Sequence, residues 1–236
     1  MKNTNNITKL FFSIIFSFSF MHVNAQESES VEEVVVTGSY IKGSATDGAS
    51  PVEIISRETI DALSASTVAD ITANLAINNG SENQVDSFTV GGGQGSSNVN
   101  LRGLGLTSTL VLLDGKRHTT AGIPANDGAV YVNTNVIPVN AIERVEVLKE
   151  GAASVYGSDA VAGVVNYIFR RNFDGLEIDV STQETDLGGS TDDKVNLIYG
   201  TSIENGNFVF AVSTLDRSPL YGSAFTPSLV PLGISG

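Results

Sequence analysis

Residues 142–166 read IERVEVLKEGAASVYGSDAVAGVVN and predict a strand, a short helix and a second strand in succession. From Ile142 to Leu148 apolar and charged residues alternate, which is typical of a half-buried strand with charges along one face. A short helix is predicted from Ala152 to Tyr156, because Gly157 follows at the position where glycine often ends a helix. The apolar run from Val161 to Phe169 predicts another strand. This stretch therefore favours mixed α/β structure.

Upstream lies an apolar run from Thr109 to Leu113, followed by Asp114-Gly115. Asp-Gly after such a run predicts a two-residue hairpin, since both central positions need a positive φ. The loop that follows, residues 117–135, is long, and long loops inside compact domains are usually functional. A strand is also predicted at Val99–Gly103. The glycines at 91–95 lead into this strand rather than into a helix, so they indicate a flexible loop and not a phosphate-binding loop.

Two short helices are predicted nearer the N-terminus, after a short strand at Pro51–Ile55. The first starts at Ser56 or Thr59 and runs to Leu63. The second starts at a capping box, Thr67-Val68-Ala69-Asp70, and is predicted to stop at Asn78-Asn79-Gly80. Its apolar residues share one helical face, which predicts a buried side; they are Val68, Ile71 and Leu75.

Beyond Arg171 the pattern changes to alternating polarity. Leu176, Ile178 and Val180 alternate with polar residues, and the segments Lys194–Tyr199 and Phe208–Ser213 do the same. Segments of this kind separated by turns are typical of a transmembrane β-barrel wall. A soluble antiparallel sheet gives the same alternation, so this pattern alone leaves both open.

The N-terminus has the pattern of an export signal. A short stretch with two lysines precedes the apolar run Leu10–Val23, and small residues follow before Gln26. This run is too short to cross a bilayer as a helix, which takes about 20 residues. We therefore expect cleavage near Gln26. The β-branched run 31–38 then precedes a Gly- and Ser-rich segment at 39–50, which suits a strand that is offered to another protein.

Composition excludes several classes of function. The chain has 236 residues and a formal net charge of −13, which argues against nucleic-acid binding. It has no cysteine, so disulfides, thiolate zinc sites and thiol nucleophiles are excluded. Its two histidines, His22 and His118, make a histidine-built metal centre improbable. We expect no metal and no cofactor.

Five motifs occur in a fixed order along the chain. They are EVVVTG (33–38), NLRG (100–103), VLLDGKR (111–117), IERVEV (142–147) and SVYGSDAVAGVVN (154–166). Behind an export signal and before alternating segments, this set resembles the N-terminal plug domain of TonB-dependent outer-membrane receptors. The match covers about Val31 to Arg171, and the segments after it resemble the first strands of the receptor barrel.

The resemblance implies an α+β plug domain, a mixed sheet with short helices, followed by the start of an antiparallel transmembrane β-barrel. In this family the plug fills a barrel of about 22 strands until substrate binds outside. The TonB C-terminal domain then captures an N-terminal box and couples transport to the proton gradient. The implied division is a signal peptide (1–25), a TonB-box segment with its linker (26–50), a plug (51–171) and barrel strands (172–236).

The resemblance also assigns residues. The TonB box is expected at Glu33, Val34, Val35, Val36 and Thr37. Arg102 and Arg144 match plug arginines that face carboxylates of the barrel wall, and such a bidentate pair is a suitable latch. The loop 117–131 is expected to face outward and meet a small-molecule ligand. Its polar side chains are suited to hydrogen-bond a polar substrate; they are His118, Asn126, Asp127 and Tyr131.

The 65 residues after Arg171 are enough for about three or four strands, so we expect a truncated barrel. The prediction is thus the N-terminal part of an outer-membrane receptor for uptake of a siderophore, cobalamin or saccharide. One alternative is a secreted or periplasmic β-rich binding module that donates its N-terminal strand. An enzyme is not expected. Ser154, His118 and Asp114 or Asp159 supply hydrolase residue types, but Ser154 lacks the Gly-x-Ser-x-Gly setting.

Overall fold

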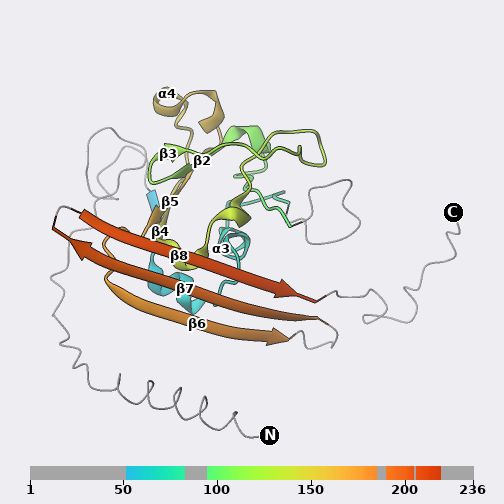
Figure 1. Cartoon of the computed structure of the whole chain (residues 1–236). Helices are drawn as coiled ribbons and strands as arrows, with labels where there is room; N and C mark the ends of the chain where they lie inside the picture. Colours follow the sequence, from blue (N-terminus) through green and yellow to red (C-terminus); the bar gives the residue numbers. More distant parts are fainter. Residues whose placement is uncertain (1–51, 83–94, 185–189, 205, 219–236) are drawn as a thin grey trace, which may run out of the picture. The chain divides into compact units, whose positions relative to one another are not determined.

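A computed structural model of the chain describes residues 52–82, 95–184, 190–204 and 206–218 (Figure 1). All of these residues belong to one compact unit. The predicted signal peptide, the predicted TonB box and its linker, most of the glycine-rich stretch and residues 219–236 lie outside the described residues.

The elements follow one another in a mixed order of short helices and strands. They are β1 (Val52–Ile55), α2 (Arg57–Ala62), α3 (Val68–Ala73), η1 (Leu106–Ser108), β2 (Thr109–Leu113), β3 (Lys116–Arg117), η2 (Thr134–Val136), η3 (Val139–Ala141), β4 (Ile142–Leu148), α4 (Ala153–Tyr156), η4 (Ser158–Ala160), β5 (Gly163–Phe169), β6 (Gly175–Glu184), β7 (Thr191–Ile203) and β8 (Gly206–Arg217).

The first five strands form one mixed sheet in the order β1-β4-β5-β2-β3. β2 and β5 are parallel, and the other neighbours are antiparallel. The predicted hairpin at Asp114-Gly115 is confirmed: both residues have positive φ, 50° and 75°, and Leu113 pairs with Lys116. This local turn sets the register of β3 against β2.

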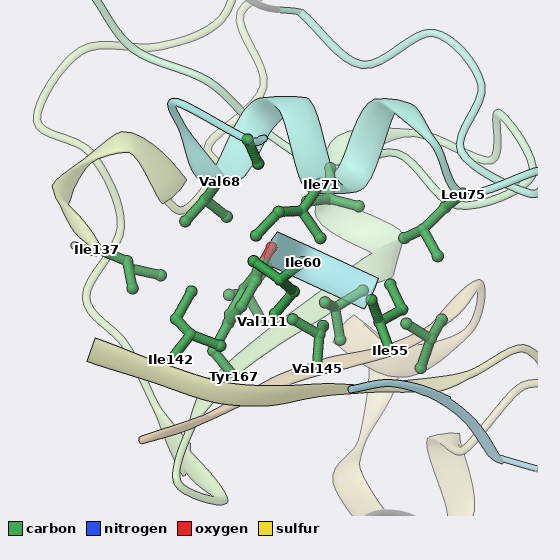
Figure 2. Close-up of a cluster of buried hydrophobic side chains, with 14 of the residues drawn as sticks. Ile55, Ile60, Val68, Ile71, Leu75, Val111, Ile137, Ile142, Val145 and Tyr167 are labelled. Atoms are coloured by element: carbon green, nitrogen blue, oxygen red, sulfur yellow. The ribbon is translucent and has the colours of Figure 1, made fainter. Parts of the chain in front are cut away.

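The main core lies between one face of this sheet and the helices α2 and α3. Figure 2 shows Ile60, Val68 and Ile71 from the helices facing Val145 and Tyr167 from the sheet. The predicted capping box starts α3: the Thr67 hydroxyl accepts from Asp70 N, and the Asp70 carboxylate accepts from Thr67 N at 2.8 Å. The helix buries the predicted face because the cap fixes where its 3.6-residue period begins.

The opposite face of the same sheet is also covered. A second cluster contains Leu110, Leu112, Leu148 and Val164 of the sheet together with Ala152 and Ala160. Ala152 directly precedes α4, and Ala160 is the last residue of η4. The prediction of a half-buried β4 is therefore wrong. Its Glu146 is completely buried, on the sheet face that carries this second cluster.

Two other predictions need correction. Val99–Gly103 is not a strand: Leu101 makes an isolated bridge with Asn78, and Arg102 has a φ of 58°. Asparagine side chains replace the sheet ladder here, since Asn100 N donates to Asn78 Oδ1. Helix α3 ends at Ala73 rather than near residue 78, because the chain turns there and Asn78 Nδ2 donates to the Thr72 carbonyl.

The last three strands form an antiparallel sheet in the order β6-β7-β8, in which they lie side by side (Figure 1). The register brings apolar residues of the three strands into rows, such as Leu176–Tyr199–Phe210 and Ile178–Leu197–Val212. On the other face, Asp179, Asn196 and Ser213 form a polar row beside the buried Ile198. There, Asn196 donates to Asp179 and accepts from Ser213.

Candidate functional site: the plug, its arginines and its long loop

Arg102 lies at a left-handed turn just after the bridge residue Leu101. Its guanidinium donates to the backbone carbonyls of Val161 (3.2 Å) and Ala162 (2.9 Å). These carbonyls directly precede β5, so Arg102 holds the segment 100–103 against the start of that strand. Arg102 itself remains exposed.

Arg144 lies on β4 and is mostly buried, with 14% of its side chain exposed. Its Nε donates to Glu146 Oε1 at 3.0 Å, and its Nη1 is 3.6 Å from Glu143 Oε1. Within this chain, Arg144 therefore neutralises a carboxylate of the plug itself. The predicted latch would pair Arg102 and Arg144 with carboxylates of the barrel wall. This pairing stays a prediction.

A chain of hydrogen bonds connects the β2–β3 hairpin to that ion pair. Asn166 Oδ1 accepts from Gly115 N at 2.9 Å, and Asn166 Nδ2 donates to Glu146 Oε2 at 3.4 Å. Asp114 accepts from Phe169 N at 3.0 Å and pairs with Arg171. Sequence reasoning missed Glu146 and Asn166. The available signal was that Arg144 and Glu146 lie on one face of a strand, two residues apart.

The long loop after β3 is stabilised by a buried residue of its own, Tyr131. Tyr131 is buried beside Leu106 and Ala125, and its hydroxyl lies 2.8 Å from Ser96 Oγ. Asn126 and Asp127 are exposed, although Asn126 N donates to Glu82 and Asp127 accepts from Ala129 N. His118 Nδ1 lies 2.8 Å from the Thr119 carbonyl. Tyr131 is thus separated from the other three predicted ligand residues by its burial.

The candidate hydrolase residues do not form a site. Asp159 pairs with Arg117, Asp114 pairs with Arg171, and Ser154 is exposed on α4. Burial raises the pKa of the Tyr167 hydroxyl, which has no hydrogen-bond partner among the described residues. No cluster of three metal-binding side chains occurs within the ranges that the structure describes.

Comparison with known proteins decides the family. The family described as TonB-dependent Receptor Plug Domain matches residues 44–164, which is about half of the chain. The chain belongs to this family. The match includes β1, β2, β3 and β4 and the first two residues of β5, and thus the hairpin and both arginines of the plug.

Relatives of the plug and its following strands carry consistent names. The iron-regulated outer membrane virulence protein of Vibrio cholerae serotype O1 is 31% identical over 160 residues, which are 67% of this chain and 23% of that protein. The vitamin B12 transporter BtuB of the same organism is 29% identical over 204 residues, 86% of this chain and 30% of that protein. The chain therefore spans less than a third of the length of these relatives.

Solved structures show the same fold. The siderophore receptor PirA from Acinetobacter baumannii matches with a TM-score of 0.54 at 23% identity, over 70% of this chain and 24% of that one. The ferric citrate transporter FecA in its unliganded form matches with a TM-score of 0.54 at 21% identity, over 72% of this chain and 26% of that one. The relatives are named as transporters and receptors, which supports a role other than catalysis.

Proposed function

We propose that the chain acts as part of a TonB-dependent outer-membrane receptor, in which the plug gates a pore for energy-coupled uptake of a scarce nutrient. In this proposal residues 1–25 are a cleaved signal, 26–50 carry the TonB box and its linker, 51–171 form the plug, and 172–236 supply barrel strands. The family membership of residues 44–164 supports the central part of this division.

The two faces of the β6–β8 sheet carry the proposal. One face exposes a continuous apolar surface, with Val180 70% exposed, Leu176 61% and Phe210 51%. Exposed apolar patches of this kind mark membrane or protein interfaces. The other face carries the polar row of Asp179, Asn196 and Ser213 beside the buried Ile198, and the sheet is bonded to the plug where Asn140 donates to the Leu197 backbone carbonyl at 2.8 Å. A sheet that is apolar outside and polar inside is typical of a transmembrane barrel wall around a hydrophilic interior. No helix among the described residues is long and apolar enough to cross a membrane.

The ligand belongs to the siderophore, cobalamin or saccharide class in this proposal. Names of relatives include a vitamin B12 transporter and siderophore receptors, which supports the first two classes. His118, Asn126 and Asp127 lie on the loop that would meet the ligand, and Asn126 and Asp127 expose their side chains. Tyr131 would not contact the ligand itself. Its hydrogen bond with Ser96 would hold the loop in its conformation.

The arginine latch forms part of the same proposal. Arg102 and Arg144 would face carboxylates on the barrel wall, and charge-assisted pairs of this type are directional and hard to break on one side. Arg144 would add a wall carboxylate to Glu146 rather than exchange one for the other, because Glu146 is fully buried and needs its cation.

TonB binding tests the coupling role. The box Glu33, Val34, Val35, Val36 and Thr37 would add as a strand to the TonB C-terminal domain, so its backbone N–H groups matter most. Calorimetry of the full chain with that domain should show binding that is lost in Val35→Pro, since proline removes a donor and disfavours strand pairing. Val31→Pro, just before the box, is the matched control and should bind like wild type.

The result also separates the alternative. Equal binding by wild type and Val35→Pro, or none by either, would contradict the TonB-box assignment. That outcome would favour a periplasmic binding module that donates its strand elsewhere.

A further inference from the structure

A buried lysine connects the three-stranded sheet to the plug helices. Lys194 on β7 is 8% exposed, and its ammonium donates to the backbone carbonyl of Ala65 at 3.0 Å. Ala65 lies in the connection between α2 and α3, 129 residues earlier in the chain. Burying an ammonium is unfavourable unless it is paired and hydrogen-bonded, so this contact is a built feature of the fold.

The backbone around Ala65 is shaped for this contact. Ser64 has a φ of 50°, an uncommon conformation for a residue other than glycine, and its N–H donates to the Asp61 carbonyl. Ser66 N donates to the Asp70 carboxylate, as part of the cap of α3. Ala65 is therefore held between the last turn of α2 and the cap of α3, with its carbonyl occupied by Lys194.

Charges on the two sides are complementary. The helices carry Asp61 and Asp70, and the cations opposite come from or next to the three-stranded sheet. The Arg57 guanidinium is the main cause that lowers the pKa of Asp61, and the charges of Arg170 and Lys194 act in the same direction. Lys194 also lies 3.9 Å from Asp179 on β6, which adds a counter-charge on its own sheet.

A second contact connects the plug to the same three-stranded sheet. Asn140 of η3 donates from Nδ2 to the carbonyls of Leu197 (2.8 Å) and Val212 (3.3 Å), so it lies across the β7–β8 pair. Arg57 of α2 in turn donates to the carbonyls of Val139 and Ile142 on either side of η3. The α2–α3 connection and η3 are thereby joined into one contact region.

We propose that the α2–α3 connection of the plug is a docking element for the β6–β8 sheet, with Lys194 as the anchor that the sheet supplies. Lys194 acts by positioning this connection, and Asn140 supports it from the plug side. The Lys194 contact is made to a backbone carbonyl, so it is separate from the predicted latch of Arg102 and Arg144. It rests on the proposed function only in taking β6–β8 as part of a barrel wall.

Amine acetylation of the wild-type full chain tests the docking without any substitution. In detergent solution, acetic anhydride should modify Lys194 about tenfold or more slowly than Lys149 and Lys116, because a buried amine reacts only through local opening. The reference lysines are accessible: Lys149 has 41% of its side chain exposed, and Lys116 is exposed on β3. Mass spectrometry of the peptides gives the rates. Equal rates at the three lysines would overturn the proposal.

Hydrogen exchange then tests what the anchor does. In Lys194→Met, amides of residues 57–75 should exchange about tenfold faster, while those of β4 and β5 keep the wild-type rate. Lys149→Met is the control and should change neither region. A uniform rise over all peptides, or no rise at residues 57–75, would contradict a docking role. These measurements do not involve TonB or ligand, so they can succeed or fail independently of the TonB-binding test.

Discussion

Glu146 is fully buried in the central sheet of the plug, and the Arg144 guanidinium two residues earlier on β4 donates to its carboxylate at 3.0 Å. Asn166 on the neighbouring strand also donates to Glu146. The plug thus holds a buried ion pair on the sheet face that carries its second apolar cluster. Removing one partner of such a pair leaves a buried charge without compensation, whereas removing both does not.

Arg144→Met should therefore destabilise the chain by about 3–5 kcal/mol, because it leaves the Glu146 carboxylate buried without its counter-charge. The double variant Arg144→Met/Glu146→Leu should recover most of this loss. Urea unfolding of the three proteins, followed by far-UV circular dichroism, measures the free energies of unfolding.

Glu143→Gln is the control for this prediction. Glu143 also lies near Arg144, at 3.6 Å, but about half of its side chain is exposed. Surface pairs contribute only about 0–1 kcal/mol, so this variant should be close to wild type. A double variant that is no more stable than Arg144→Met would mean that Arg144 and Glu146 are not coupled.

Gly163 at the start of β5 has no room for a side chain. A Cβ built there would lie 2.4 Å from the Leu148 carbonyl oxygen and 2.8 Å from Leu101 Cδ1, and its φ is 140°. Gly163→Ala should destabilise the chain by about 2–4 kcal/mol, through overpacking and an unfavourable φ together. Thermal unfolding measures this loss.

Gly122→Ala provides the matched comparison. Gly122 lies in the long loop, where an added Cβ would meet open space. We expect its melting temperature to stay near that of wild type. A melting temperature of Gly163→Ala as close to wild type as that of Gly122→Ala would show that β5 tolerates a side chain at position 163 and that the sheet can shift to accept it.

The parts of the fold that could be predicted from the sequence are those formed by residues close together in the chain. The Asp114-Gly115 turn and the Thr67–Asp70 capping box involve residues within four positions of each other, and both are confirmed. Their geometry depends on φ preferences and short hydrogen bonds, which any surrounding fold leaves in place.

Burial of β4 could not be predicted in the same way. The alternation around Glu146 is typical of a strand with a solvated face, but in the structure that face carries the second apolar cluster and Glu146 is completely buried. The segment 99–103 failed for a related reason: its extended pattern is satisfied by side chains of Asn78 and Asn100 rather than by a strand. Both outcomes depend on contacts between residues far apart in the sequence.

Acid should remove a stabilising ion pair within α2. Hydrogen bonding from Arg57 lowers the pKa of Asp61 below its ordinary value of 3.8. A carboxylate with a lowered folded-state pKa stabilises the fold above its unfolded pKa, and that contribution is lost as the pH falls through the folded value. The difference in melting temperature between wild type and Asp61→Asn should be full at about pH 6 and disappear toward about pH 2.

The Arg57→Met background is the control for this pH effect. With the guanidinium gone, Asp61→Asn should change the melting temperature little at any pH. A pH-dependent difference that persists in this background would assign the effect to another cation, such as Arg170 or Lys194, which also act on Asp61.

Tyr131 distinguishes a loop brace from a ligand contact. Its side chain is 4% exposed and its hydroxyl lies 2.8 Å from the buried Ser96 Oγ, so Tyr131→Phe should cost about 1 kcal/mol of stability. In a double-mutant cycle with Ser96→Ala, most of this cost should be coupling energy, since the two hydroxyls bond each other. Tyr199→Phe, on the exposed face of β7, should be near neutral. Chemical denaturation gives the free energies of unfolding of the four proteins in the cycle and of the Tyr199→Phe control. A coupling energy near zero would show that the hydroxyl does not brace the loop, and Tyr131 would then return to the set of ligand-facing residues with His118, Asn126 and Asp127.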